Sequence, residues 1–271
     1  MSVPKDQPAD PKALVVLART IAEEVALRLV ASLDGVGPTI ATKSSPTDLV
    51  TEMDTWAEAH ITERLLSARP NDAVLGEEGA NISGTSGVTW SVDPIDGTVN
   101  FVHGLPGFCV SLAAQVDGQS VAGVVVSPLH RDVFEATLGG GASRNGKPIH
   151  CASPASVSRC VVGTGFGYDP DRRRRQAAVL TEVISHIADI RRGGAAAVDL
   201  CSVACGRLDA YWEVGLNPWD HAAGGLIAAE AGAKVGTLDG SAPSDRFILA
   251  APPAHWDEFV TLLSNAGATA V

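Results

Sequence analysis

The stretch Trp90-Ser-Val-Asp-Pro-Ile-Asp-Gly-Thr-Val-Asn-Phe-Val-His-Gly-Leu-Pro106 places two carboxylates directly after a short apolar run. The carboxylates are Asp93 and Asp96, and the following pair, Gly97-Thr98, predicts a turn into a helix. Hard anionic ligands beside free backbone N–H groups suit a divalent metal ion and a phosphate together. We therefore treat this stretch as the centre of a site, and we expect other segments to hold it or to bring further carboxylates to it.

Composition places the chain among globular proteins. It has 271 residues, of which 45% are hydrophobic and 19% are charged, enough for a sizeable core. Its formal net charge of −11 gives no support to nucleic-acid binding or to binding at an anionic membrane surface. Because no uninterrupted apolar run reaches about 18 residues, the sequence predicts no membrane-spanning helix.

The cysteine pattern bears on the redox compartment. The count is odd and no C-x-x-C pair occurs, so a disulfide framework is not expected and a reducing cytoplasm is predicted. The first residues contain no apolar core that could act as a signal peptide, which favours the same location. The five cysteines are Cys109, Cys151, Cys160, Cys201 and Cys205.

Two other segments repeat the layout of a carboxylate at the end or start of an element. A strand-like run, Ala73-Val-Leu75, leads into Gly76-Glu-Glu-Gly79, although two glutamates in such a turn are also typical of an exposed loop. Asp220 falls in the first turn of a predicted buried helix, where an isolated charge needs a partner. Together Glu77, Asp93, Asp96 and Asp220 form an all-oxygen set suited to Mg²⁺ or Mn²⁺. With no zinc spacing, Walker A or G-x-S-x-G motif, metal-assisted phosphoester chemistry is favoured.

The hydrophobic periodicity predicts helices at both ends of the chain and strands in the middle. Asp54 is expected to cap a helix over about 54–69, while Asp-Gly and Pro-Leu-His-Arg turns predict an antiparallel meander. The meander strands are expected at 108–116, 120–127 and 132–137, with further strands near 160–163, 208–214, 234–237 and 247–250. Further helices are expected at about 10–35, 170–187, 198–205 and 253–265, and from Pro218 onward.

Two polar segments leave alternatives open. The turn-rich segment 43–51 is either an ordinary surface connection or a loop that brings Lys43 to the site. Arg172-Arg-Arg-Arg175 is either a solvated helix face or part of a site mouth or subunit contact, and is weak evidence for RNA binding.

In order and spacing, these motifs resemble the inositol monophosphatase family of Mg²⁺-dependent, lithium-sensitive phosphatases. The resemblance extends from about residue 12 to 265 and implies a layered αβαβα sandwich, a single domain over 1–271. Its N-terminal half, about 10–150, is expected to carry most metal ligands, and its C-terminal half, about 151–265, Asp220 and the substrate contacts. The matching segments are Gly76-Glu-Glu-Gly79, Trp90-x-x-Asp-Pro-Ile-Asp-Gly-Thr-x-Asn-Phe101, Trp219-Asp-x-Ala-Ala-Gly224, residues 43–51 and Asp209-Ala-Tyr-Trp-Glu213.

The resemblance also implies roles for individual residues, with two to three metal ions and a metal-activated water as nucleophile. Glu77 and Thr98 are implied to orient the water, with Asp54 interacting with Thr98, and Lys43 to belong to a mobile loop. Implied metal ligands are Glu77, Asp93, the Ile95 carbonyl, Asp96 and Asp220; implied substrate contacts are Asp96, Gly97, Thr98, the Ala196 backbone and Glu213.

The implied substrate is a small phosphorylated polyol, in first place myo-inositol 1-phosphate. Alternatives with the same chemistry are histidinol phosphate, fructose 1,6-bisphosphate, 3′-phosphoadenosine 5′-phosphate (PAP) and NADP. An alternative of another class is a partner protein in transcription antitermination, and a homodimer is expected by resemblance. One departure bears on substrate recognition: Ala195 stands where the family often has Ser or Thr.

Overall fold

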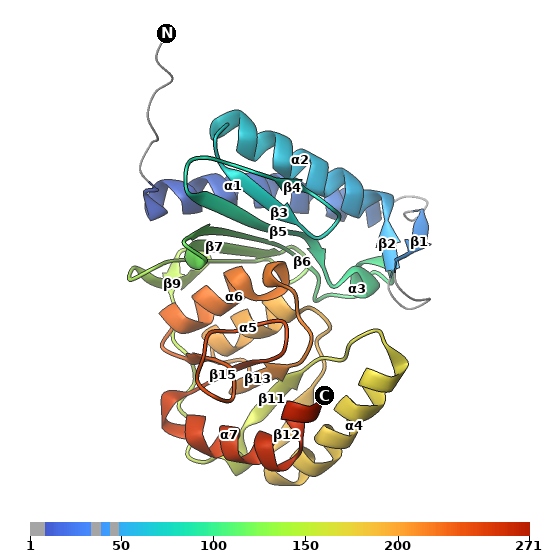
Figure 1. Ribbon diagram of the computed structural model, residues 1–271, viewed down its shortest axis with the longest axis vertical. Helices are drawn as coiled ribbons and strands as arrows, with labels where there is room; N and C mark the ends of the chain where they lie inside the picture. Colours follow the sequence, from blue (N-terminus) through green and yellow to red (C-terminus); the bar gives the residue numbers. More distant parts are fainter. Residues whose placement is uncertain (1–8, 34–38, 44–48) are drawn as a thin grey trace.

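The computed structural model describes residues 9–33, 39–43 and 49–271. Helices and sheets alternate in five layers, so the predicted αβαβα arrangement is confirmed (Figure 1). One helix layer covers the outer face of a large sheet, another lies between the two sheets, and the third covers the outer face of a smaller sheet. These layers are α1 (Pro11–Leu33) and α2 (Glu52–Ala68), then α5 (Ala196–Ala204) and α6 (Pro218–Glu230), then α4 (Pro170–Val183) and α7 (Trp256–Asn265).

The larger sheet has eight strands in the order β10-β9-β8-β7-β6-β5-β3-β4. Its central strands pair antiparallel with their chain neighbours, which confirms the predicted meander. The strands are β3 (Ala73–Gly76), β4 (Asn81–Ile82), β5 (Val88–Asp96), β6 (Cys109–Val116), β7 (Gln119–Ser127), β8 (Asp132–Thr137), β9 (Gly141–Arg144) and β10 (Lys147–Pro148).

The smaller sheet has five strands in the order β12-β11-β13-β15-β14, and a separate antiparallel pair precedes α2. In the smaller sheet β11 runs parallel to both of its neighbours, whereas β15 runs antiparallel to β13 and β14. Its strands are β11 (Val161–Thr164), β12 (Asp189–Arg191), β13 (Ala210–Glu213), β14 (Lys234–Gly236) and β15 (Ile248–Ala251), and the separate pair is β1 (Ile40–Thr42) and β2 (Leu49–Thr51).

Three buried apolar clusters hold the layers together. The first packs α1 and α2 on the large sheet, the second packs α5 and α6 between the sheets, and the third packs α4 and α7 on the small sheet. Trp90 and Trp212, each at most 1% exposed, lie in the first and third clusters. Each fully buried Leu, Ile or Phe contributes about 1.5–3 kcal/mol, so these clusters are the main source of stability.

Several helix ends differ from the sequence prediction, among them those of α2 and α4. Asp54 does not cap α2 from outside: the N-cap is Thr51, and Asp54 is the third helical residue of a capping box. The predicted helix over 170–187 ends at Val183 and continues as a 3₁₀ turn. The remaining short elements are α3 (Thr98–Val102) and 3₁₀ turns at Val157–Arg159, Ile184–His186, Pro253–His255 and Ala268–Ala270.

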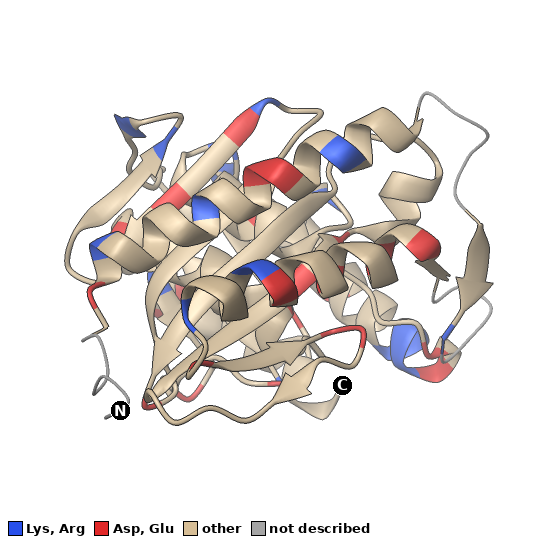
Figure 2. Cartoon of the chain, turned by 90° about the horizontal axis from the view of Figure 1, so that it is seen from above, with Lys and Arg blue, Asp and Glu red and all other residues tan. Residues whose placement is uncertain are grey.

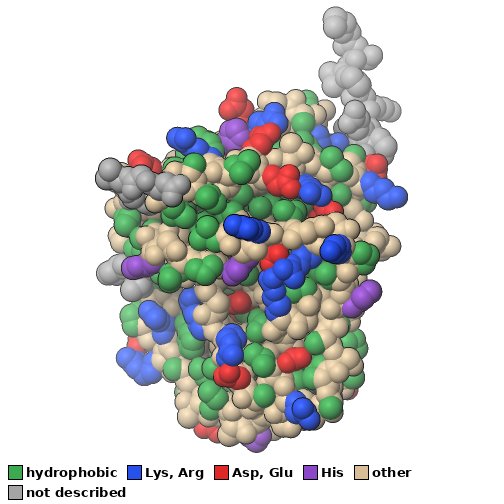
Figure 3. Space-filling model, turned by 180° about the vertical axis from the view of Figure 1, so that it is seen from behind, with side chains coloured by type: hydrophobic (Ala, Val, Ile, Leu, Met, Phe, Trp, Pro, Cys, Tyr) green, Lys and Arg blue, Asp and Glu red, His purple; other side chains and the backbone are tan. Residues whose placement is uncertain are grey.

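Charges of both signs are interspersed on the outer helices (Figure 2). Arg19 pairs with Glu23 along α1, and Arg64 of α2 reaches Glu24 of α1, each at 2.9 Å. The back of the molecule, relative to the view of Figure 1, likewise carries acidic and basic side chains among apolar ones (Figure 3). No helix in the described part of the chain is long and apolar enough to cross a membrane.

The large sheet brings two carboxylate-bearing segments to one edge. β3 and β5 are parallel neighbours, and Gly76 stands opposite Val92, so Glu77 and Asp93 follow side by side where the pairing of these two strands ends. The register of β5 against β6 shifts between Asp93 and Asp96, around Pro94, which has no N–H to donate to a ladder. The expectation that these two strand ends converge is confirmed.

Candidate metal and phosphate site

A cavity of about 460 Å³ lies where the ends of β3 and β5 face the N-termini of α5 and α6. It gathers residues from both halves of the chain, and every predicted site residue except Asp54 contributes to its lining. Asp54 is buried behind Thr98. The predicted residues in the lining are Lys43, Glu77, Asp93, Ile95, Asp96, Gly97, Thr98, Ala196, Glu213 and Asp220.

Four carboxylates crowd one side of this cavity. Asp93 is 1% exposed, and burial raises its pKa well above the usual range, with further increases from the charges of Glu77, Asp96 and Asp220. Burial likewise raises the pKa of Asp220 to about 7, against the opposing hydrogen bond from the Asn217 N–H. These shifts mean that negative charge is poorly compensated by the protein here, and a bound cation would relieve the repulsion.

Asp96 ties the two halves of the chain together. Its carboxylate accepts hydrogen bonds from the N–H groups of Ala196, at 3.2 Å, and Ala197, at 2.7 Å, in the first turn of α5. The N-cap residue of that helix, Ala195, has no side-chain oxygen, so Asp96 takes over the capping role from a distant part of the chain. Burial and the Asp220 charge still raise the pKa of Asp96 well above its usual range.

Asp220 is held by its own helix. It is the third residue of α6, and its carboxylate accepts from the Asn217 N–H at 2.7 Å to form a capping box. The predicted helix start at Pro218 is therefore confirmed, and it directs an acidic side chain into the cavity at the positive end of a helix.

Thr98 lies at the cavity wall and packs against Asp54, which is fully buried behind it. The Thr98 hydroxyl lies 3.2 Å from Asp54 Oδ1 and 3.0 Å from the Ile95 carbonyl, while Asp54 Oδ2 accepts from the Thr51 N–H at 2.7 Å. Burial raises the pKa of Asp54, and its bonds with Thr51 oppose that increase. The predicted contact between Asp54 and Thr98 is therefore present, and it orients the hydroxyl at the start of α3.

Gly97 is the N-cap of α3 and adopts a φ of 87°. A Cβ at this position would lie 3.0 Å from the Gly107 carbonyl and 3.1 Å from the Ala195 Cβ, so both conformation and space require glycine. Glycine at position 97 therefore lets the turn at the start of α3 approach residues 194–195 of the C-terminal half closely.

Lys43 reaches the site from the end of β1. Its ammonium lies 2.9 Å from Glu77 and also pairs with Glu78. Burial lowers the pKa of Lys43, but the two glutamates outweigh it and raise that pKa above its ordinary value. Of the two alternatives for segment 43–51, Lys43 therefore belongs to the site; the following residues 44–48 lie outside the described part of the chain.

Glu213 faces the carboxylate cluster from the end of β13. Burial raises its pKa to about 7, while a hydrogen bond from the Tyr211 hydroxyl and the charge of Arg192 act in the opposite direction. Arg172 and Arg192 also line the cavity, so Arg172 takes the site-mouth role that the sequence left open. Arg192 was not singled out from sequence, because an arginine pair before a glycine turn is common on surfaces.

The donor chemistry fits a hard divalent cation, since every candidate ligand is a carboxylate or carbonyl oxygen. Within residues 9–33, 39–43 and 49–271, however, no three Asp, Glu, His or Cys side chains are already arranged around one point as metal ligands. Asp96 and Asp220 are hydrogen-bonded to backbone N–H groups, and Glu77 is paired with Lys43.

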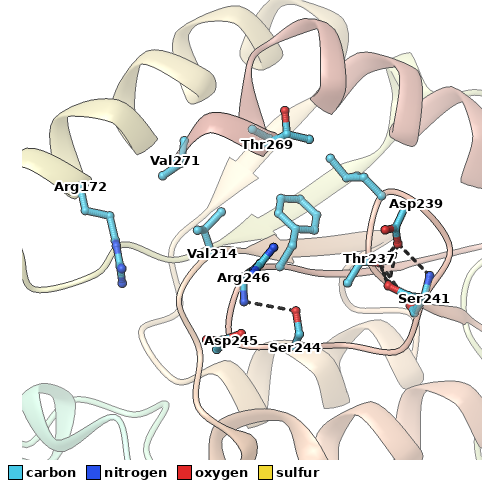
Figure 4. A pocket seen from close by; sticks show the side chains of 13 residues that line it. Arg172, Val214, Thr237, Asp239, Ser241, Ser244, Asp245, Arg246, Thr269 and Val271 are labelled. Atoms are coloured by element: carbon cyan, nitrogen blue, oxygen red, sulfur yellow. Dashed lines mark hydrogen bonds between the residues drawn. The ribbon is translucent and has the colours of Figure 1, made fainter.

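A second cavity, of about 570 Å³, adjoins the first and shares Arg172 (Figure 4). This cavity is larger than the first, but its lining does not offer a free carboxylate at Asp239. The Asp239 carboxylate accepts hydrogen bonds from the hydroxyl groups of Thr237 and Ser241 within one turn. The hydrogen bond from Ser241 leads those that lower the pKa of Asp239 to about 2. That carboxylate serves the turn, so the crowded carboxylates of the smaller cavity remain the better metal site.

The Inositol monophosphatase family model matches residues 10–267, nearly the whole chain. The chain belongs to the inositol monophosphatase family. A protein named Inositol-1-monophosphatase from Mycobacterium bovis is 46% identical over 242 residues, which cover 86% of this chain and 83% of that protein. A protein named Nus factor SuhB from Pseudomonas aeruginosa is 40% identical over 200 residues, covering 72% and 74%.

A crystal structure of the extragenic suppressor protein suhB from Bartonella henselae superposes with a TM-score of 0.87. The sequence identity is 34%, and the match covers 93% of this chain and 98% of that one. Inositol monophosphatases are generally metal-dependent phosphatases, and the chain is a phosphatase of this family.

Proposed function

We propose that the chain is a Mg²⁺-dependent phosphomonoesterase that hydrolyses myo-inositol 1-phosphate to myo-inositol and phosphate. The observation that carries the proposal is the single cavity in which four carboxylates face the Gly97-Thr98 turn. Two to three Mg²⁺ ions, or Mn²⁺ in their place, would be held by Glu77, Asp93, the Ile95 carbonyl, Asp96 and Asp220. When bound, the ions lower the pKa of a coordinated water and neutralise charge on the phosphate and the leaving oxygen.

Glu77, Thr98 and Asp54 handle the proton of the attacking water. Glu77 lies at the cavity wall and accepts that proton, and the Thr98 hydroxyl orients the water. Asp54 accepts from the Thr98 hydroxyl at 3.2 Å, so a lone pair of this oxygen is left to receive a hydrogen bond from the water. The N–H groups of Gly97 and Thr98 bind the phosphate at the start of α3.

The alcohol part of the substrate is read by Asp96 together with residues of the C-terminal half of the chain. Glu213, Asp96 and the Ala196 backbone contact the hydroxyl groups of the polyol in this proposal. The Ala196 N–H donates to Asp96 at 3.2 Å, so a substrate hydroxyl competes for it or binds to the Asp96 oxygen that it orients. Lys43 closes over the site from the side of Glu77.

A substrate panel tests the choice of alcohol. Turnover of myo-inositol 1-phosphate, histidinol phosphate, fructose 1,6-bisphosphate, PAP and NADP is measured with Mg²⁺ and again after chelation. Fastest turnover of myo-inositol 1-phosphate, lost on chelation, is expected. Faster turnover of histidinol phosphate would assign another substrate to the same chemistry, and undiminished turnover in chelator would refute the metal dependence.

A binding function of another class is suggested by the relative named Nus factor SuhB. In that case the chain would act as a partner protein in transcription antitermination. Capture of transcription factors by an Asp93→Asn protein that has lost hydrolysis would support this function. A silent pull-down together with robust hydrolysis by the parent protein would exclude it.

Three further properties stay predictions. A homodimer and lithium sensitivity follow from family resemblance, and a cytoplasmic location follows from the cysteine pattern. The five cysteines are free, which is compatible with a reducing compartment.

A further inference from the structure

Glu58, on the inner face of α2, is a buried carboxylate to which neither motif nor spacing drew attention. It is 6% exposed, and its two oxygens accept hydrogen bonds from two backbone N–H groups of one turn. Oε2 accepts from Glu78 at 2.7 Å and Oε1 accepts from Ala80 at 2.8 Å. No Lys, Arg or His of the described residues lies within ion-pair distance of Glu58, so these N–H groups hold the charge.

The turn that Glu58 holds is built to receive it. A Cβ on Gly76 would lie 2.1 Å from Glu58 Oε2, so the turn has room for the carboxylate only because residue 76 is glycine. The Gly76 N–H donates to the Ala80 carbonyl at 2.7 Å, and the Glu77 N–H donates to the Val92 carbonyl of β5 at 3.2 Å. The turn is therefore tied to α2 on one side and to β5 on the other.

This turn carries the carboxylate that faces Asp93. Fixing the N–H of Glu78 fixes the peptide plane between Glu77 and Glu78, because that plane contains this N–H. The Glu77 N–H is also bound, to the Val92 carbonyl, so the peptide planes on both sides of the Glu77 Cα are held and together set its Cα–Cβ direction. Hydrogen bonds to a charged acceptor are stronger than those between neutral groups, so two of them hold the turn firmly.

We propose that Glu58 is a positioning residue, which sets the Glu77 carboxylate for metal binding by clamping the turn 77–80. The inference rests on the proposed metal-dependent function. If Glu58 served only to stabilise the fold, its loss would lower stability without a specific effect on metal affinity.

Glu58→Gln tests the clamp with little change in shape. The amide oxygen accepts from one N–H, but the amide nitrogen then faces the other N–H as a second donor. The measurement is binding of Mn²⁺ alone, without substrate, by electron paramagnetic resonance, together with the melting temperature of the metal-free protein. Loss of an outer partner of a metal ligand costs about 10–100-fold in affinity, and a decrease in this range is expected.

Glu63→Gln is the matched control, because Glu63 lies on the same helix, is exposed and loses the same charge. It should bind Mn²⁺ as the parent protein does. Glu58→Asp keeps the charge but is too short to reach both N–H groups, so an intermediate affinity is expected. At saturating metal, KM for the phosphate substrate should be unchanged in Glu58→Gln.

The outcomes separate the inference from the function beneath it. Parental Mn²⁺ affinity in both Glu58 variants, with or without a lower melting temperature, overturns the positioning role. A parent protein that neither binds Mn²⁺ nor needs metal for turnover refutes the proposed function itself. Weaker Mn²⁺ binding in Glu58→Gln but not in Glu63→Gln supports the inference.

Discussion

Replacement of Asp220 by Asn is predicted to stabilise the metal-free protein while it abolishes most of the activity. Asp220 lies among three other carboxylates, and its pKa is raised from 3.8 to about 7, with burial as the largest cause. The amide is neutral and its oxygen still accepts from the Asn217 N–H, so the capping box of α6 is retained.

The magnitude follows from the pKa. Each pKa unit corresponds to about 1.4 kcal/mol, so removal of the charge raises the free energy of unfolding by up to about 4 kcal/mol at pH 8. Because the repulsion is shared among neighbouring carboxylates, this value is an upper limit. For a chain of this size it corresponds to an increase in melting temperature of up to about 10 °C.

The pH dependence has a definite sign. The folded protein holds the Asp220 proton to a higher pH than the unfolded chain does. The stability associated with this group is therefore full below pH 3.8 and is lost as the pH rises through about 7. The difference between Asp220→Asn and the parent should be largest at pH 8 and less than half as large at pH 5.

The assay is thermal and urea unfolding in chelator at pH 5 and pH 8, beside phosphatase activity with saturating Mg²⁺. Activity should decrease by at least about 100-fold. Even mutation of a residue that only hydrogen-bonds to a metal ligand lowers metal affinity or activity by about 10–100-fold. A variant that is less stable than the parent at pH 8 in chelator, or a difference independent of pH, would refute the reasoning.

Three further changes test other parts of the site. Asp93→Asn should lower phosphatase activity at least about 100-fold, and parental activity would contradict the assignment of Asp93 as a metal ligand. Asn100→Ala removes hydrogen bonds to the Gly107 and Gly193 carbonyls, at 3.0 and 2.9 Å, and should lower the free energy of unfolding in urea by about 1–3 kcal/mol. Ala195→Ser adds an N-cap side chain to α5 but should leave the urea midpoint nearly unchanged, because Asp96 already accepts from the first N–H groups of this helix; a gain of about 1–2 kcal/mol would show that Asp96 is not its cap.

Local sequence was sufficient to predict most elements and the chemistry of the site. The turns of the meander, the Asn217-Pro218 helix start and the turn at Gly97-Thr98 each follow from residue types within a few positions. The error at α2 was also local: Thr51 rather than Asp54 is the N-cap, because both residue types suit that position. Residue types alone indicated carboxylate ligands for a hard cation, and their order along the chain resembled one family.

Tertiary structure decided how those residues are held. Asp96 caps a helix that begins 100 residues later, and Glu58 clamps a turn 20 residues away, so neither contact follows from a local pattern. Arg192 joins the lining for the same reason, since its place depends on how the two sheets face each other. The stretch from Trp90 to Pro106 thus identifies the chemistry, whereas long-range packing determines which groups position its carboxylates.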